Sequence, residues 1–222
     1  GIAVTNTPDV LTGDVADHAV AMWLAAARGI VGADAWVRTG RWAEARWPLQ
    51  RRAFGGRAGI LGLGRIGAAI AARLAGFEME IAYAARAAKP VVFRFEPDPV
   101  ALADWADVLF VATTGGAETE ALVSAEVIRA LGPRGMLVNI ARGSVVDEEA
   151  LIAALGDGGL GFAALDVFRD EPTPDPRFRT LPNVLLQPHQ ASATEETRRA
   201  MGALMRENVT AFFAGTPLPS PV

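Results

Sequence analysis

The sequence predicts an α/β fold with a doubly wound parallel sheet, chiefly because short apolar runs alternate with longer helical patterns along the chain. The apolar runs are continuous and do not alternate with polar residues, which is typical of strands covered on both faces. Alternation of strands and helices favours parallel strands joined by helices. No repeat, linker or break in composition divides the chain, so residues 1–222 are predicted to form one domain.

The first helix is predicted to begin after Thr12 or Asp14, which are both usable N-caps, and to run to about Arg38. A polar stretch that contains tryptophans follows at 40–54. Strands are predicted at 57–61, 79–83, 108–112, 135–140, 161–166 and 184–187. Helices are predicted at 65–74, 99–105, 124–131 and 147–155, and a final long helix at about 194–214 stops at Gly215.

The composition excludes several classes of protein. With 25 Asp and Glu against 21 Lys and Arg, the formal net charge is −4, which argues against a nucleic-acid partner. The lack of Cys excludes a disulfide scaffold, a thiolate nucleophile and a Cys-based zinc site, and no metal is expected. The longest apolar run, 19–27, is too short to cross a bilayer, and the N-terminus lacks a signal-peptide pattern. We therefore expect a soluble, cytoplasmic protein without a membrane partner.

Three glycines lie at the turn between the strand at 57–61 and the helix that follows. Gly62, Gly64 and Gly67 form G-x-G-x-x-G in the strand-then-helix context that makes this pattern informative. Gly62 permits a tight turn, Gly64 lets the backbone approach a pyrophosphate, and Gly67 lets the helix pack close to the strand. The N–H groups of Arg65 and Ile66 would point at the phosphates from the helix N-terminus. The sequence therefore predicts a Rossmann-like dinucleotide-binding domain.

The end of the next strand indicates which dinucleotide binds. An NAD site places an acidic residue on the ribose hydroxyls about 20 residues after the glycines. Here Tyr83 is followed by Ala84, Ala85 and Arg86, with Lys89 nearby. Arg86 suits a 2′-phosphate as a bidentate donor, and no acid is present to repel that phosphate. NADP(H) is therefore predicted in preference to NAD(H).

Three segments near strand ends carry the candidate catalytic residues: VNIARGS with Arg142, DVFRDEP with Asp166 and Glu171, and QPHQAS with His189. Ligands of open α/β sheets bind beyond the carboxyl ends of the strands, so these segments are expected to converge. His suits proton transfer near neutral pH, a neighbouring Glu would orient it, and Arg can hold a carboxylate and the adjacent carbonyl oxygen. The set suits the reduction of a ketone by a nicotinamide. His18, inside the first helix, is interpreted as structural.

The chain resembles the D-isomer-specific 2-hydroxyacid dehydrogenase family. The motifs that carry the resemblance span nearly the whole chain: TNTPDVLTGDVADHAV, GLGRIG, LVNIARGSVVDEEALIAAL, ALDVFRDEP and LPNVLLQPHQASATEETR. Within the family, VTNTPDVLTGDVAD and residues 86–90 are most similar to the NADPH-preferring hydroxypyruvate, glyoxylate and hydroxyphenylpyruvate reductases. The resemblance implies an oxidoreductase that transfers a hydride from NADPH to the carbonyl of such a small 2-oxo acid, giving a D-2-hydroxy acid.

The resemblance also implies a role for each candidate residue. Arg142 would bind the substrate carboxylate and carbonyl, His189 would be the acid/base paired with Glu171, and Asp166 would hold the nicotinamide carboxamide. The other implied cofactor residues are Gly62, Gly64, Arg65, Ile66 and Gly67 at the pyrophosphate, Arg86 at the 2′-phosphate, Thr113 at the adenosine ribose, and Ile140 and Ala141 at the nicotinamide.

The sequence departs from the family's pattern in three places. The loop TTGGAET replaces a stretch that usually carries Pro and Leu, which is expected to alter the contacts on the adenosine side. Ala85 stands where close relatives tend to have a hydroxyl residue, so 2′-phosphate binding is expected to be weaker. Gln190 and Ala191 replace the usual apolar residue and Gly, which is expected to shift His189 or alter the pocket.

The family normally adds an N-terminal substrate domain of roughly 100 residues, whereas this chain begins where the cofactor domain begins. We expect residues 1–222 to be the dinucleotide-binding domain. We expect the segment at about 12–54 to form a homodimer and the helix at about 194–214 to pack on a missing substrate domain. Without closure of that domain, cofactor binding with little turnover is expected. Tryptophans suit a dimer interface, and Trp47 is expected to reach the partner's substrate pocket.

Two alternatives remain open. The chain could be a non-catalytic nucleotide-sensing or corepressor-like module, against which the Arg142, Glu171 and His189 set argues. It could also be another family member, such as an NAD-linked phosphoglycerate-type dehydrogenase, which Arg86 disfavours, or a formate dehydrogenase, which Glu171 disfavours.

Overall fold

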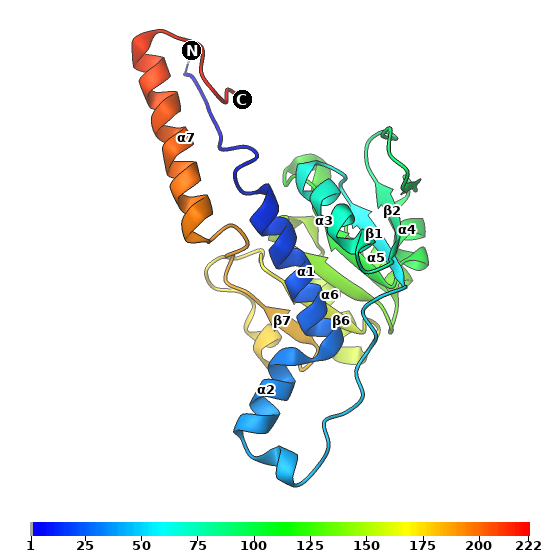
Figure 1. Ribbon diagram of the computed structural model, residues 1–222. Coiled ribbons are helices and arrows are strands. Elements are labelled where there is room, and N and C mark those ends of the chain that lie inside the picture. Colours follow the sequence, from blue (N-terminus) through cyan, green and yellow to red (C-terminus); the bar gives the residue numbers. More distant parts are fainter. Residues whose placement is uncertain (1) are drawn as a thin grey trace.

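The computed structural model describes residues 2–222 and is built around one parallel sheet of seven strands (Figure 1). The strands are β1 (Arg57–Leu61), β2 (Glu80–Ala84), β3 (Arg94–Phe95), β4 (Val108–Val111), β5 (Met136–Asn139), β6 (Phe162–Leu165) and β7 (Val184–Leu186). Their order is β3-β2-β1-β4-β5-β6-β7, and every neighbouring pair is parallel. The chain runs outward from the centre twice, first to β3 and then from β4 to β7, which is the doubly wound topology. The predicted fold class is confirmed.

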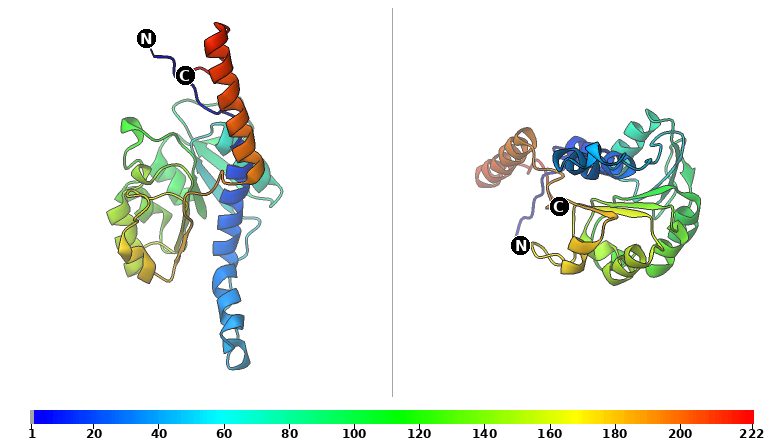
Figure 2. Two further views of the ribbon diagram at one scale, coloured as in Figure 1. Left: turned by 90° about the vertical axis from the view of Figure 1, so that its left-hand side faces the viewer. Right: turned by 90° about the horizontal axis from the view of Figure 1, so that it is seen from below.

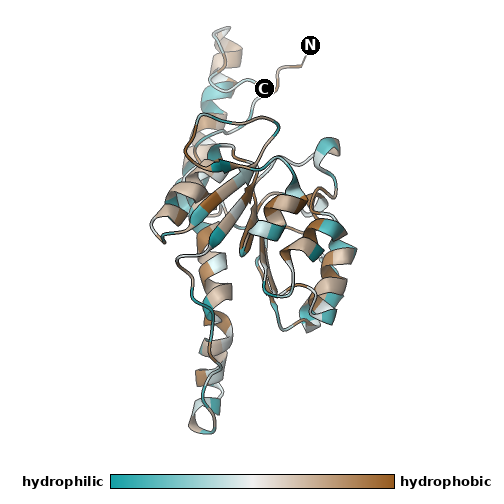
Figure 3. Ribbon diagram, turned by 90° about the vertical axis from the view of Figure 1, so that its right-hand side faces the viewer, coloured by the Kyte–Doolittle hydropathy of each residue, from teal (hydrophilic) through white to brown (hydrophobic). Residues whose placement is uncertain are grey.

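Helices cover both faces of the sheet. The chain contains α1 (Thr12–Arg28), α2 (Ile30–Arg38), α3 (Arg65–Ala75), α4 (Pro99–Trp105), α5 (Ala125–Leu131), α6 (Glu148–Asp157) and α7 (Glu195–Ala214), and all but α2 and α7 pack on the sheet. On one face α1 and α3 pack around Ile60, Tyr83 and Phe110, and on the other α4, α5 and α6 pack around Leu109 and Leu137. Figure 3 shows the hydrophobic strands lying between the helical layers. Two apolar cores, one on each face, therefore hold the sheet in place.

The first helix differs from its prediction because it breaks at Gly29. α1 ends at Arg28, and Gly29 takes the left-handed conformation with φ 59°. A Cβ at this position would lie 2.6 Å from Oε1 of Gln50, which is the end of an exposed side chain and can move, so the left-handed conformation is the stronger reason for glycine here. No single helix within residues 2–222 is long and apolar enough to cross a membrane, although α1 and α2 together reach that length and composition with a 57° bend between them.

The start of α1 also differs from its prediction. The helix begins at Thr12, and the residue at its N-cap is Leu11, which provides no side-chain hydrogen bond. Neither predicted cap therefore serves as one. The carboxylate of Asp14 instead accepts hydrogen bonds from the hydroxyls of Thr194 and Thr197, at the start of α7. The prediction was wrong because the carboxylate has partners from the far end of the chain.

The remaining predicted elements agree with the structure within a few residues. The strand at 57–61 and the helix at 99–105 have the predicted bounds as β1 and α4. β3 was not predicted, because two residues are too short to show a pattern. It forms only by pairing with the edge of β2, where Ala82 and Tyr83 lie opposite Arg94 and Phe95.

The last helix, α7, lies outside the layers of the α/β body (Figure 2). Only Thr197 and Asn208 are buried along its length, whereas apolar side chains such as Val209, Phe212 and Phe213 are exposed. The chain then turns back, and the side-chain amide of Asn208 donates to the hydroxyl of Ser220 and accepts from its backbone N–H. Residues near both ends of the chain thus lie beside α7, with Thr5 bridged to Pro221.

Candidate active site

A cleft of about 1030 Å³ lies where the carboxyl ends of the central strands meet the N-terminal segment. One wall is the segment from Asn6 to Thr12, and the opposite walls follow β1, β4 and β5. Among the predicted residues, the cleft is lined by Gly64, Arg65, Ile66, Thr113, Ile140, Ala141, Arg142 and Glu171. Residues from four separate segments therefore meet where ligands of this topology bind.

The glycine turn after β1 has the shape that a pyrophosphate requires. Gly62 has φ 100°, and a Cβ there would lie 2.7 Å from the backbone of Thr113. A Cβ at Gly67 would lie 2.1 Å from the carbonyl oxygen of Gly62, so this glycine lets α3 approach the turn. At Gly64, by contrast, none of the described residues other than its immediate chain neighbours comes within 4 Å of an added Cβ. Gly62 and Gly67 therefore serve packing inside the protein, whereas Gly64 borders open space in the cleft.

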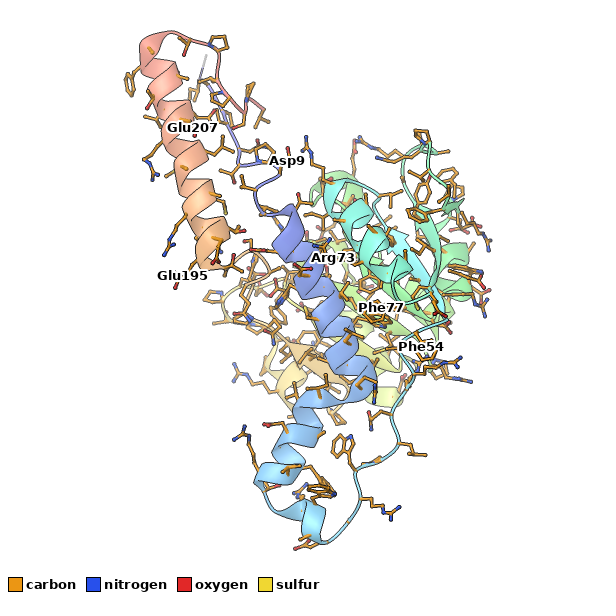
Figure 4. All side chains as sticks on the ribbon, in the orientation of Figure 1. Asp9, Phe54, Arg73, Phe77, Glu195 and Glu207 are labelled. Atoms are coloured by element: carbon orange, nitrogen blue, oxygen red, sulfur yellow. The ribbon has the colours of Figure 1, made fainter. Side chains whose placement is uncertain are left out.

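The N-terminus of α3 opens into the same cleft. Its N-cap is Gly64, and no side chain among the described residues caps its first turn, so the N–H groups at its start can receive an anion. The side chain of Arg65 pairs with Asp9, with 2.7 Å between Nε and Oδ1. Asp9 belongs to the N-terminal segment, between α7 and α3 in Figure 4. This pair links the two walls of the cleft.

Arg86 follows β2 and is exposed, outside the residues that line the cleft. The loop that carries Arg86 is anchored to β2, because the backbone N–H of Lys89 donates to the hydroxyl of Tyr83 at 2.7 Å. Tyr83 itself is fully buried. An exposed guanidinium on an anchored loop, beside the glycine turn of the neighbouring strand, suits a charged group at the outer end of a dinucleotide.

The loop after β5 brings Ile140, Ala141 and Arg142 to the cleft, and a residue that sequence reasoning missed shapes it. Asn139 is 1% exposed; its Oδ1 accepts from the N–H of Ala141 at 3.0 Å, and its Nδ2 donates to the carbonyl of Arg142 at 3.1 Å. The signal in the sequence was a polar residue at the end of an otherwise apolar strand. The guanidinium of Arg142 is exposed and donates to the carbonyl of Ala141 at 2.6 Å.

His189 and Glu171 form a pair beside Arg142's loop. Nδ1 of His189 and Oε2 of Glu171 are 2.6 Å apart, and the other oxygen of Glu171 accepts from the N–H of Phe168 at 2.9 Å. Because the N–H of Phe168 fixes one carboxylate oxygen of Glu171, the other oxygen can orient the imidazole. Phe168 also fits closely against Gly143, where an added Cβ would lie 1.9 Å from the carbonyl carbon of Phe168. The two loops therefore meet without a side chain between them.

Asp166 lies behind this pair and is 1% exposed. Its two carboxylate oxygens accept from the backbone N–H groups of Gln190 and Ala191, each at 2.9 Å. Burial raises the pKa of Asp166. The contact with His18 and these two backbone hydrogen bonds lower that pKa by more than burial raises it, so the pKa lies below its usual value. The two oxygens thus hold the turn after His189.

Trp47 lies apart from the cleft of its own chain. Its ring packs over Gly29 and Gly32, where an added Cβ would lie 3.2 and 2.7 Å from ring atoms. Its ring also makes an edge contact with Trp36. Within residues 2–222, no three His, Asp or Glu side chains gather in a way that could hold a metal ion.

Comparison with known proteins adds to this geometry. Residues 20–191 match the family described as D-isomer specific 2-hydroxyacid dehydrogenase, NAD binding domain. A 2-ketogluconate reductase of Gluconobacter oxydans is 48% identical over 222 residues, which are the whole chain and 72% of that protein.

Two solved structures are similar over the whole chain. A 2-hydroxyacid dehydrogenase from Ketogulonicigenium vulgare Y25 is 62% identical with a TM-score of 0.96, and the chain covers 71% of it. An NADPH-dependent glyoxylate/hydroxypyruvate reductase from Sinorhizobium meliloti, in complex with NADP and malonate, is 44% identical with a TM-score of 0.96, and the chain covers 70% of it.

Proposed function

The chain belongs to the NAD(P)-dependent D-isomer specific 2-hydroxyacid dehydrogenase family, and from that premise we propose that it reduces the carbonyl of a small 2-oxo acid with NADPH. Glyoxylate, hydroxypyruvate and hydroxyphenylpyruvate are the proposed substrates. The observation that carries the proposal is the 2.6 Å contact between His189 and Glu171, next to a cleft that Arg142 lines. A proton donor, its orienting carboxylate and a cation for the substrate thus lie together.

Each side chain has a distinct role in the proposed reaction. Arg142 binds the carboxylate and the carbonyl oxygen of the substrate, since its planar fork of N–H donors matches both. The contact with Glu171 occupies Nδ1 of His189, so Nε2 is the nitrogen that gives its proton to the carbonyl oxygen. NADPH, when bound, supplies the hydride that the carbonyl carbon accepts. The open space at Gly64 and the uncapped start of α3 fit the pyrophosphate of that cofactor.

The test of this role is the variant His189→Ala. In single-turnover assays with the protein in excess over NADPH and with hydroxypyruvate, the variant is expected to lose reduction while NADPH binding, followed by nicotinamide fluorescence, is unchanged. Retained reduction would contradict the proposal. Because the 222-residue chain is expected to turn over slowly, the comparison asks whether that slow reduction depends on His189; reduction that does not depend on it would favour a nucleotide-sensing module.

We assign the preference for NADPH to Arg86. The chain has no acid at the end of β2, and the exposed guanidinium of Arg86 can pair with a 2′-phosphate. Arg86→Ala is expected to weaken NADPH binding by about 10- to 100-fold, the range of a hydrogen bond to a charged group, and to leave NADH binding unchanged. Arg129→Ala, which removes an exposed guanidinium from α5, is the matched control. Equal losses for NADPH and NADH would show that Arg86 does not select between them.

We also propose that two copies associate through residues 12–54 and that Trp47 of one copy reaches the substrate pocket of the other. Support comes from Trp47 lying away from its own cleft and from exposed apolar residues on α2 and the loop after it. The 222-residue chain assayed alone is expected to bind NADPH and turn over slowly, because His189 and Glu171 are 47% and 34% exposed and water reaches the reacting groups. Turnover comparable with that of a full-length relative would contradict this expectation.

A further inference from the structure

His18 is a half-buried side chain that the proposed reaction does not use. It lies on α1, which packs across β5, β6 and β7. Its Nε2 is enclosed and lies 3.5 Å from Oδ1 of Asp166, and it has no hydrogen-bond partner of normal geometry among residues 2–222. The nitrogen therefore faces one oxygen of one carboxylate.

That carboxylate holds the turn on which His189 depends. Asp166 accepts from the N–H groups of Gln190 and Ala191, directly after His189. His189 itself has φ 51°, a conformation that residues with a side chain adopt at a cost. Such a turn persists only where its surroundings hold it, and here they hold it through Asp166.

The chemistry of the contact determines which form of His18 lies there. Asp166 is 1% exposed, and its pKa stays below the usual value because His18 and the two N–H groups offset the effect of burial. An ionised carboxylate only accepts hydrogen bonds, so the imidazole nitrogen that faces it must carry a proton. His18 therefore lies where it can be a third donor to the same carboxylate, across the 3.5 Å contact.

Helix α1 also contacts the segment after His189 at a second place. Asp14 lies four residues before His18, on the same side of α1, and accepts from Thr194 and Thr197. The stretch from His189 to Thr197 is thus tied to α1 near both of its ends, through Asp166 at one and Asp14 at the other.

We propose that His18 is a positioning residue, whose Nε2–H group holds Asp166 and, through it, the turn that presents His189 to Glu171. The importance of that turn for catalysis rests on the proposed function, whereas the contact between His18 and Asp166 does not. His18 touches neither the substrate nor the cofactor in this role, and its effect reaches His189 through one carboxylate and two backbone N–H groups.

The first experiment uses the unsubstituted protein without cofactor. The sequence has 2 His, so a long-range ¹H–¹⁵N spectrum of the imidazoles contains signals from His18 and His189 only. We expect Nε2 of His18 to be protonated at neutral pH. An unprotonated Nε2 would overturn the proposal, and this result requires neither a variant nor any enzymatic activity.

The second experiment compares His18→Leu, which fills the space without a donor, with His18→Gln, which places an amide donor near the position of Nε2. Amide exchange at Gln190 and Ala191 is expected to be about tenfold faster in His18→Leu, which corresponds to about 1.4 kcal/mol, and the His189 imidazole signals are expected to shift. His18→Gln is expected to restore both. Ala21→Gln, at an exposed position of α1, is the control and is expected to change neither.

Two results would overturn the proposal: unchanged exchange and unchanged His189 signals in a folded His18→Leu protein, or failure of His18→Gln to restore them. If His18 served packing alone, His18→Leu would preserve the amide exchange rates and the His189 signals at least as well as His18→Gln. Should His189→Ala retain the slow reduction of the unsubstituted protein while the exchange result holds, the proposed function is wrong and the role of His18 in holding the turn is retained.

Discussion

At the level of single residues, Gly143 has the least room for a side chain among the glycines that line the cleft. A Cβ there would lie 1.9 Å from the carbonyl carbon of Phe168 and 2.1 Å from its oxygen, which are both backbone atoms that cannot rotate away. Gly143→Ala is therefore expected to lower the free energy of unfolding by about 1–3 kcal/mol, the usual cost of overpacking, and to move Arg142 away from Glu171. Urea unfolding and NADPH-dependent reduction measure the two effects.

Gly202→Ala is the control for that variant. Gly202 is half-buried within α7, where an added Cβ comes no closer than 3.5 Å to the mobile end of Arg206. This change is expected to be neutral or to raise stability by up to about 1 kcal/mol through helix propensity. Equal stability of the Gly143 and Gly202 variants would contradict the steric argument.

Asp166 provides a prediction about pH. Its folded pKa lies below the usual 3.8, so the stability that its charge contributes is present above that value and is lost as the pH falls through the folded pKa. Asp166→Asn is expected to lower the free energy of unfolding by about 1.5–3 kcal/mol at neutral pH, because hydrogen bonds to a charged acceptor are lost. The difference between the two proteins should be constant from pH 7 to pH 5 and shrink below pH 3.8. A difference that grows on acidification would contradict the direction of the shift.

At the scale of elements, the start of α7 depends on contacts with α1. Thr194 is the N-cap of α7, its hydroxyl accepts from the N–H of Thr197 at 3.1 Å, and the same hydroxyl donates to Asp14. Thr194→Ala is expected to cost about 1 kcal/mol of unfolding free energy, the typical worth of a cap. Thr210→Ala, at an exposed position within α7, is the control and should cost nothing. Equal effects in urea unfolding would contradict the role of Thr194.

At the scale of the whole molecule, residues on and after α2 form the proposed contact between copies. Val31, Val37 and Trp42 are 60%, 55% and 67% exposed, and Leu49 is fully exposed. Exposed apolar groups that extend from the α/β body favour association, because association removes them from water. Sedimentation at micromolar concentration is expected to show a dimer, and Val37→Asp is expected to dissociate it.

Val92→Asp is the control for the dimer. Val92 is 96% exposed but lies before β3, far along the chain from the proposed interface, so its replacement is expected to leave the dimer intact. A monomer in the unsubstituted protein at that concentration would contradict the proposal.

Local patterns were sufficient for most of the fold. Continuous apolar runs predicted six of the strands, and the G-x-G-x-x-G pattern indicated the turn between β1 and α3, because these signals depend on residues that are close in sequence. The bend at Gly29 escaped prediction because glycine within an apolar helical pattern is often tolerated. The left-handed conformation of Gly29 is what ends α1 there.

The sheet, its helices and the glycine turn could be predicted from the sequence, since periodicity and turn chemistry act over a few residues. The polar residues that follow the strands could be identified in the same way. The partners of the polar side chains became known only from the folded chain: Asp14 meets Thr194, 180 positions away, and Asp166 meets Gln190, Ala191 and His18. Such contacts follow from packing of distant segments, which leaves no signature in any short stretch of sequence. The physical reason is that a polar side chain can satisfy its hydrogen bonds in many ways, and only the folded chain selects one.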